Sequence, residues 1–279
     1  MDLIVTLQCS DQPGIVHAMT SAILACGGNI IENQQFTDPD SNVFVMRTRF
    51  ETEISFKEAE TLLRTELERF APNLSLREYS VKKRAIIMVT TESHCLRELL
   101  FLREIGEMPV EIVGVFSNHN HLRELVESAG LTFTHLPLAA LGKEIAERDV
   151  LKFVAENEVQ FVILARYMQI LSHNFCQQLA GKIINIHHSF LPGFKGSKPY
   201  HQAHARGVKV IGATAHFVTA DLDEGPIIDQ DVAHVTHQLS PEELIALGRD
   251  IERRVLSRAV KLFAEDRIFI VGQKTIVFN

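Results

Sequence analysis

The chain of 279 residues has a formal net charge of -7 at pH 7, with 46% hydrophobic and 23% charged residues. These values are typical of folded globular proteins, and the length predicts two domains, the larger with a substantial core. The acidic balance argues against a nucleic-acid partner, because phosphate backbones are bound by clustered Lys and Arg. No apolar run approaches the roughly 20 residues needed to span a bilayer, so we expect no membrane association.

The amino terminus and the cysteines favour a cytoplasmic location. Residues 1–5 lack the basic region and cleavage site of a signal peptide and are typical of a strand. The four cysteines are far apart and form no C-x-x-C, which argues against a zinc knuckle and a disulfide framework. We expect buried thiols in a reducing compartment. They are Cys9, Cys26, Cys95 and Cys176.

The first eighty residues predict a ferredoxin-like βαββαβ domain. Val, Ile and Phe dominate the expected strands, Gly27-Gly28 ends the first helix, and residues 38–41 supply a turn between the middle strands. We therefore expect a first domain over residues 1–82, followed by a short charged join. The strands are expected at 3–9, 29–37, 43–50 and 74–79, and the helices at 15–26 and 55–70.

Residues 83–279 predict a second domain of Rossmann-like type, with a mostly parallel open sheet. Strands alternate with helical stretches, a pattern that places helices on both faces of parallel strands. Residues 212–218 and 227–235 predict an antiparallel addition, and a long helix over 241–264 precedes a terminal hairpin. The parallel strands are expected at 85–90, 111–117, 161–164 and 182–186, and the helices between them at 94–104, 121–129, 143–156 and 173–179.

Three polar residues follow the last two predicted strands of this sheet. Asn185 and His187 are two positions apart at the end of one strand, so their side chains project to the same side of the sheet. Asp223 lies in the loop after the next strand. Ligands of open α/β sheets bind beyond the carboxyl ends of the strands. An amide, an imidazole and a carboxylate are the groups needed to attack a carbonyl and stabilise the resulting oxyanion.

The motifs around these residues resemble the folate-dependent formyltransferase fold. The resemblance implies that Asn185, His187 and Asp223 are the catalytic residues. It also implies a pterin pocket lined by Met168, Ile170, Leu171, Ala220, Asp221 and Leu222. The matching motifs are Asn185-x-His187-x-Ser189-x-Leu191-Pro192, Gly212-Ala213-Thr214-x-His216 and Asp223-x-Gly225-Pro226-Ile227-Ile228-x-Gln230.

Within that fold the chain is most similar to the formyltetrahydrofolate deformylases. The loop over residues 91–96 has no Gly and carries Glu92, which makes it a poor phosphate cradle, and no basic domain follows the fold. The resemblance implies hydrolysis of 10-formyltetrahydrofolate to formate and tetrahydrofolate, in one-carbon and purine metabolism. Arg166, Tyr167 and His188 are candidates for the preference for water. The motifs that carry the resemblance are Ser93-His94-Cys95-Leu96, residues 165–171, His187-His188, residues 199–203 and residues 248–252.

The first domain resembles an ACT domain, a module that commonly binds amino acids at subunit interfaces. This implies a homo-oligomer and an amino-acid effector, glycine or methionine. The loop and helix start after the first strand offer backbone N–H groups to an effector carboxylate. The alternative is that the D-x-P-G segment is only a turn and cap. The candidate effector residues are Asp11, Gly14, Ile15 and Asn29.

Several histidines raise the hypothesis of a metal site. They are His187 with His188, His201 with His204, and His234 with His237. No H-E-x-x-H motif or Cys pair accompanies them, so we expect neither a metal nor a cofactor. Two other functions stay open. One is formyl transfer to an amine acceptor, and the other is a non-catalytic sensor of folate or an amino acid.

Overall fold

A computed structural model of the protein describes residues 1–191 and 199–279. The chain forms two compact units, Met1–Lys82 with Glu265–Asn279, and Lys83–Ala264. The expected second domain extended to residue 279, so the structure assigns its last fifteen residues to the first unit instead. Pro192, the last residue of one motif, lies outside the described residues. No helix in the described part of the chain is long and apolar enough to cross a membrane.

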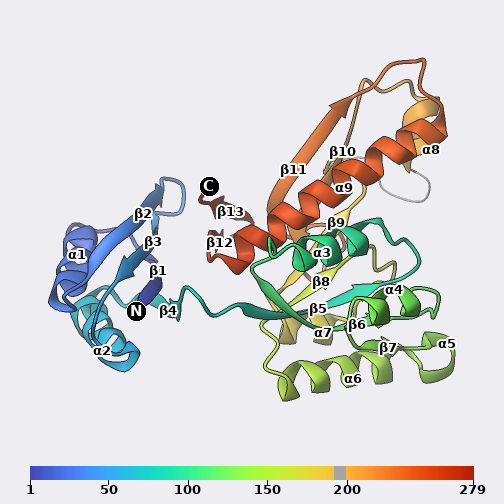
Figure 1. The fold of residues 1–279 in the computed structure, drawn as a ribbon. Coiled ribbons are helices and arrows are strands. Elements are labelled where there is room, and N and C mark those ends of the chain that lie inside the picture. The colour runs from blue at the N-terminus through green and yellow to red at the C-terminus, as the bar shows by residue number, and fades with distance from the viewer. Residues whose placement is uncertain (192–198) are drawn as a thin grey trace. The chain divides into compact units, whose positions relative to one another are not determined.

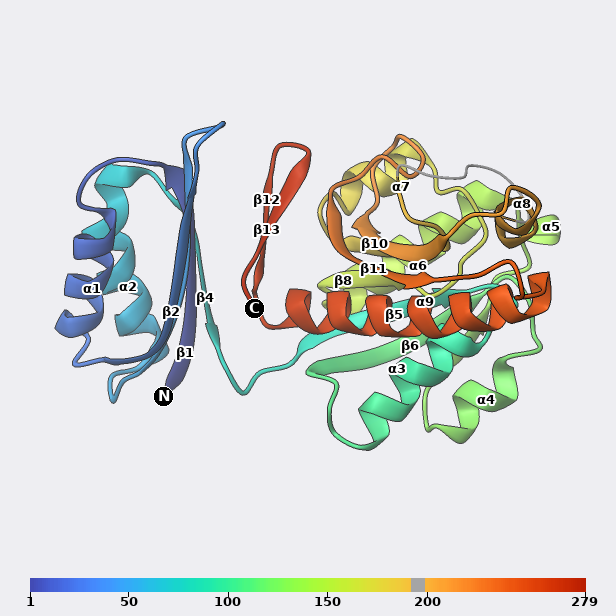
Figure 2. The ribbon, with the colours of Figure 1, turned by 90° about the horizontal axis from the view of Figure 1, so that it is seen from above.

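The first unit has the predicted βαββαβ order (Figure 1). Its four strands form an antiparallel sheet in the order β2-β3-β1-β4, and both helices lie on one face of it (Figure 2). The strands are β1 (Asp2–Ser10), β2 (Asn29–Asp38), β3 (Val43–Glu51) and β4 (Asn73–Glu78). The helices are α1 (Ile15–Ala25), α2 (Phe56–Leu67) and the 3-10 turn η1 (Glu68–Phe70).

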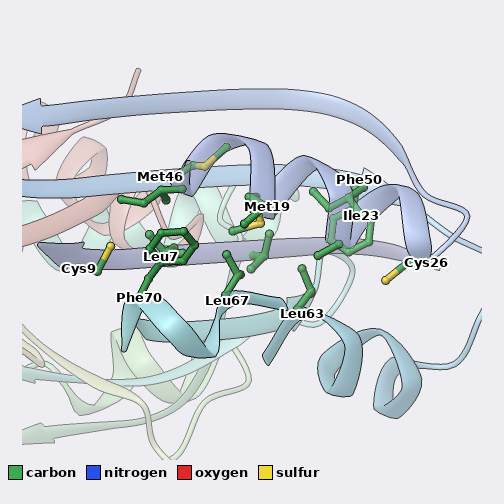
Figure 3. Packing of buried hydrophobic residues seen from close by; sticks show 14 of the residues in the cluster. Leu7, Cys9, Met19, Ile23, Cys26, Met46, Phe50, Leu63, Leu67 and Phe70 are labelled. Carbon is green, nitrogen blue, oxygen red and sulfur yellow. The ribbon is translucent and has the colours of Figure 1, made fainter. Parts of the chain in front are cut away.

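Alternating apolar residues of the strands form the core beneath these helices. Leu7 of β1, Met46 and Phe50 of β3, Met19 of α1 and Leu63 of α2 belong to one buried cluster (Figure 3). Side chains of a strand alternate between its two faces, so one face of the sheet contributes to this cluster.

Helix α2 begins with a capping box, in which the Ser55 side chain accepts from the backbone N–H of Glu58 while the Glu58 carboxylate accepts from the backbone N–H of Ser55.

The C-terminal hairpin packs on the opposite face of the same sheet. It consists of β12 (Ile268–Val271) and β13 (Lys274–Val277). Phe269, Val271 and Phe278 form a buried cluster with Val45, whose neighbours along β3 face the helices. Glu32 of β2 accepts from Arg47 at 2.8 Å and from Arg267 at 2.9 Å. The sheet of the first unit is therefore covered on both faces, which explains the corrected boundary.

Phe269→Ala should lower the free energy of unfolding of the first unit by about 3 kcal/mol, because it removes a buried ring that packs edge-on against Phe278. Urea unfolding followed by hydrogen exchange in each unit measures the effect. Phe36→Ala is the control, since Phe36 is 46% exposed. Equal loss of protection in residues 83–264 would contradict the assignment of the hairpin to the first unit.

The second unit contains a seven-stranded sheet in the order β11-β10-β9-β8-β5-β6-β7. The five strands from β9 to β7 run parallel, and β10 and β11 are antiparallel additions, as predicted. The strands are β5 (Lys83–Val89), β6 (Val110–Ser117), β7 (Phe133–His135), β8 (Phe161–Leu164), β9 (Ile183–His187), β10 (Val210–Phe217) and β11 (Ile227–His234).

Helices cover both faces of this sheet, with α3 and α9 on one side and α6 and α7 on the other (Figure 1). The short elements β7, α5 and α8 were not predicted, because three to seven residues display no clear periodicity. The helices are α3 (His94–Glu104), α4 (Arg123–Ser128), α5 (Leu138–Leu141), α6 (Lys143–Glu156), α7 (His173–Gln178), α8 (Pro199–Ala205) and α9 (Pro241–Ala264).

Candidate active site

A cavity of about 270 Å³ lies beyond the carboxyl ends of β8 and β9. Three segments line it: the residues after β8, the end of β9, and the loop after β10. It contains all three predicted catalytic residues and all six predicted substrate-binding residues. The lining includes Met168, Ile170, Leu171, Asn185, His187, Ala220, Asp221, Leu222 and Asp223.

Asn185 is held by His216, which lies opposite it in the pairing of β9 with β10. His216 Nδ1 is 2.8 Å from the Phe217 carbonyl oxygen, which only accepts, so this nitrogen carries a proton. Burial lowers the pKa of His216, which keeps the ring neutral and makes Nε2 an acceptor. Asn185 Nδ2 therefore donates to His216 Nε2, at 3.2 Å, and its second N–H has no partner among the described residues.

His187 and Asp223 form the second pair of the site. His187 Nδ1 lies 3.3 Å from Asp223 Oδ1, whereas His216 Nε2 is 3.7 Å from the same oxygen, beyond hydrogen-bonding distance. The hydrogen bond from His187 holds the pKa of Asp223 below its ordinary value, so the carboxylate is ionised at neutral pH. His187 Nε2 is buried and has no partner among the described residues. The ring thus has one nitrogen oriented by Asp223 and one available to a ligand.

The loop after β10 brings Asp223 back to the sheet. Phe217 N–H donates to the Pro226 carbonyl at 2.9 Å, which closes residues 217–226 into a return loop. A Cβ on Gly225 would lie 1.7 Å from the Phe217 carbonyl oxygen, so only glycine permits this approach. Asp223 itself has φ 58°, in the left-handed region that non-glycine residues rarely adopt. Backbone packing, in addition to its own side chain, sets the position of Asp223.

Two other motif residues hold the segment after β9. The Thr214 hydroxyl donates to the Ser189 carbonyl at 3.0 Å and accepts from Leu191 N–H at 3.1 Å. Gln230 Nε2 donates to the Leu191 carbonyl at 3.0 Å and to the Thr214 hydroxyl at 2.9 Å. These bonds fix the chain as it leaves His187.

Comparison with known proteins places this geometry in a family. Residues 83–260 match the family model described as Formyl transferase. A formyltetrahydrofolate deformylase from Corynebacterium sp. (strain P-1) is 44% identical over 280 residues, with 99% of this chain and 98% of that protein covered. The chain belongs to the formyltetrahydrofolate deformylase family.

Solved structures agree with this assignment over the whole chain. A formyltetrahydrofolate deformylase from Burkholderia mallei has a TM-score of 0.96 and 44% identity, and the match covers 100% of this chain and 99% of that one. A glycinamide ribonucleotide transformylase from Symbiobacterium toebii has a TM-score of 0.66 and 30% identity, and covers 71% of this chain and 94% of its own. The fold of the second unit is thus shared with transformylases, whereas the deformylase structure matches both units.

In this deformylase family member the mouth of the cavity is apolar. Met168, Ile170 and Leu222 are 53%, 65% and 61% exposed, although each lines the cavity. Exposed apolar side chains around a recess are typical of a ligand site. Met168 N–H donates to the Thr90 hydroxyl at 2.9 Å, which anchors the segment after β8 to the end of β5.

The predicted effector residues do not form one cluster within a chain. Asp11 and Gly14 follow the end of β1, where Ser10 pairs with Val43. Asn29 is at the other end of the sheet, because β2 and β1 both pair there with Glu51. Eight residues of strand separate the two ends, about 27 Å. The Ile15 side chain is buried in the core, so only its backbone is available.

One group of His, Cys and Glu residues in the described part is close enough to share a metal ion: His94, Cys95 and Glu252. The histidine pairs considered from sequence form no such group among the described residues. Burial raises the pKa of Cys95 well above its ordinary value, which keeps the thiol protonated. Glu252 Oε2 lies 2.8 Å from His94 Nε2, and Oε1 accepts from the Tyr200 hydroxyl at 2.9 Å. These hydrogen bonds join His94, Glu252 and Tyr200 into one network.

Sequence reasoning missed the roles of His216, Thr214, Gln230 and Glu252. All four belong to motifs that carried the resemblance, but motif membership does not say which side chain each one contacts. The apolar character of most of β10 is a signal for His216, because a histidine in a strand expected to be buried needs a hydrogen-bond partner.

His188 should titrate with a pKa of about 4, because burial and then the Arg166 charge disfavour its protonation. Ring NMR signals followed from pH 7 to pH 3, assigned with His188→Gln, measure this value. In the unfolded chain the same ring titrates near 6.5. Its contribution to stability is therefore complete above about pH 6.5 and lost as the pH falls towards 4. A midpoint near 6.5 in the folded protein would contradict the partly buried position of His188 beside Arg166.

Proposed function

We propose that the protein hydrolyses 10-formyltetrahydrofolate to formate and tetrahydrofolate. The observation that carries the proposal is the meeting of Asn185, His187 and Asp223 at one cavity in a chain 44% identical to a deformylase along its whole length. The chemistry of these three groups fits attack on a formyl carbon. The apolar mouth, with Met168 and Leu222, supplies a surface on which an aromatic pterin ring packs.

In this mechanism water adds to the formyl carbon and its oxygen becomes an oxyanion. The free N–H of Asn185 stabilises that charge, and His187 donates from Nε2 when both ring nitrogens carry protons. Asp223 favours the proton on His187 Nδ1 and accepts the proton lost by the attacking water. The intermediate then collapses, the bond between the formyl carbon and N10 breaks, and the proton passes to N10. Only side chains of this chain take part, and we propose no metal or cofactor.

Asn185→Ala should lower kcat by about 10² to 10³, because one oxyanion donor contributes about 3 kcal/mol to stabilising the transition state. Formate release from 10-formyltetrahydrofolate, measured with purified protein, provides the test. Asn174→Ala is the matched control, since Asn174 is exposed on α7. An effect on KM alone would remove Asn185 from the oxyanion role.

Asp223→Asn should abolish most hydrolysis at every pH at which the protein is folded. The amide cannot accept a proton from water, and the low pKa of Asp223 means that the native carboxylate is available well below neutral pH. The pH profile of formate release by both proteins is the measurement. Near-normal turnover by Asp223→Asn would overturn the assignment of Asp223 as the base.

We further propose that the first unit is an ACT domain, that it binds an amino acid, and that the protein is a homo-oligomer. The βαββαβ order and the antiparallel sheet support the ACT proposal. The backbone at the start of α1, after Asp11 and Gly14, is the segment proposed to bind an effector carboxylate. We also place the protein in the cytoplasm, in keeping with four free and buried cysteines.

Glycine or methionine should change the rate of formate release or the melting temperature of the intact protein. Both are measured with and without each amino acid, and mass photometry gives the oligomeric state. Unchanged rate and stability with either amino acid would leave the first unit without an effector role.

A further inference from the structure

The point where the strand order reverses is filled with protein side chains. From β5 the chain proceeds to β6 and β7 on one side, and then to β8 and β9 on the other, so the reversal lies between β5 and β8. Open α/β sheets commonly bind ligands in a crevice at this point. Here Thr90 N–H donates to the Arg166 carbonyl at 3.3 Å, and the cavity extends from the end of β8 to β9 and β10.

The side chains that fill this point converge on Glu252 of α9. We call His94, Arg166, Tyr200 and Glu252 the Glu252 network. Glu252 is 1% exposed, and its carboxylate contacts His94 Nε2 at 2.8 Å, the Tyr200 hydroxyl at 2.9 Å and Arg166 Nε at 3.4 Å. Burial raises the pKa of Glu252, but the His94 hydrogen bond and the Arg166 charge outweigh it, so the carboxylate is ionised.

The backbone is shaped to accept this network. Arg166 lies in the turn after β8 with φ 63°, a left-handed conformation, and its side chain reaches Glu252 from this turn. Gly248 lies one helical turn before Glu252, and a Cβ there would be 2.1 Å from the Tyr200 hydroxyl. The Tyr200 ring therefore occupies space against α9 that any other residue at position 248 would block.

The network reaches the catalytic residues through His188. The His188 ring stacks on His187 with centroids 5.1 Å apart and lies 6.5 Å from the Tyr200 ring. Arg166 and His188 both line the cavity. Tyr167, the third candidate for the preference for water, also lines the cavity, and its buried ring packs in the apolar cluster with Leu164 and Phe175. The catalytic His187 thus has the cavity on one side and a packed polar layer towards β5 on the other.

We propose that the Glu252 network makes water the formyl acceptor, because it closes the β5 side of the catalytic residues to larger nucleophiles. The inference rests on the proposed hydrolysis. The fold alone does not impose water, since a transformylase named for glycinamide ribonucleotide shares it. An amine entering from β5 must separate a buried ion pair, whereas a water molecule needs no such opening.

Hydroxylamine is the probe, supplied with 10-formyltetrahydrofolate. Its nitrogen bonds to the formyl carbon, the bond to N10 breaks, and the proton lost by the amine replaces the formyl group on N10. The products are formohydroxamate and tetrahydrofolate, and formate reports the competing hydrolysis. The ratio of formohydroxamate to formate is independent of the fraction of folded enzyme, so a purely structural effect leaves it unchanged.

The double variant Arg166→Gly with Glu252→Gln removes both charges of the ion pair, so it opens the network without leaving an unpaired buried charge. Glycine at position 166 readily adopts the φ of 63° found there. We expect the ratio to rise about tenfold or more over the native protein, the scale on which pocket size discriminates substrates. Tyr200→Phe removes one hydrogen bond and keeps the ring, so it should raise the ratio less. Arg254→Gln is the control, since Arg254 is exposed on α9 and pairs with Asp231.

An unchanged ratio in a variant that still releases formate overturns the inference alone. Folded variants that lose both products also overturn it, because the network would then serve the chemistry and not the choice of acceptor. If the double variant fails to fold, Tyr200→Phe decides by the same ratio. No formate from the native protein would overturn the proposed function, and this inference with it.

Discussion

The antiparallel pairing of β10 with β9 is the constraint on which the site depends. It places His216 opposite Asn185, and the buried neutral ring then fixes the orientation of the Asn185 amide. The same strand leads into the return loop that brings Asp223 to His187. A shift of one residue in this register would turn His216 to the other face of the sheet and remove the acceptor for Asn185.

Burial supplies the electrostatics of the site. His188 is neutral because it is partly buried beside Arg166, while Asp223 and Glu252 remain ionised because specific donors face them. For the two carboxylates the contact partners decide the charge, whereas for His188 burial is the larger cause. The two carboxylates lie on different sides of the His187 and His188 rings, one facing the cavity and one filling the point where the strand order reverses. The geometry separates Asp223, the proposed base, from Glu252, which is proposed to limit access to larger nucleophiles.

The first unit depends on residues from both ends of the sequence. Its helices cover one face of the sheet and the C-terminal hairpin covers the other, with Phe269 and Phe278 packed near Val45. A four-stranded sheet with only one covered face would expose Val45 to solvent. The ion pairs of Glu32 with Arg47 and Arg267 join the hairpin to β2 and β3. The first unit is therefore formed by two separate segments of the sequence, residues 1–82 and 265–279.

The sequence by itself determined the order of most elements in both units. The periodicity of apolar residues is local, and it placed α1, α2, α6 and α9 and nearly all the strands within a few residues. Motif spacing also determined which residues meet at the cavity, since Asn185, His187 and Asp223 follow adjacent strands. Short elements such as β7 were missed, because three residues display no period.

Only the tertiary structure decided what each of these residues contacts. His216 orients Asn185, Gly225 lets the Asp223 loop approach Phe217, and Glu252 joins helix α9 to the turn after β8. The separation of Asn29 from Asp11 and the position of the C-terminal hairpin were decided in the same way. These are contacts between residues far apart in sequence, and they depend on register and packing, which a local pattern does not encode.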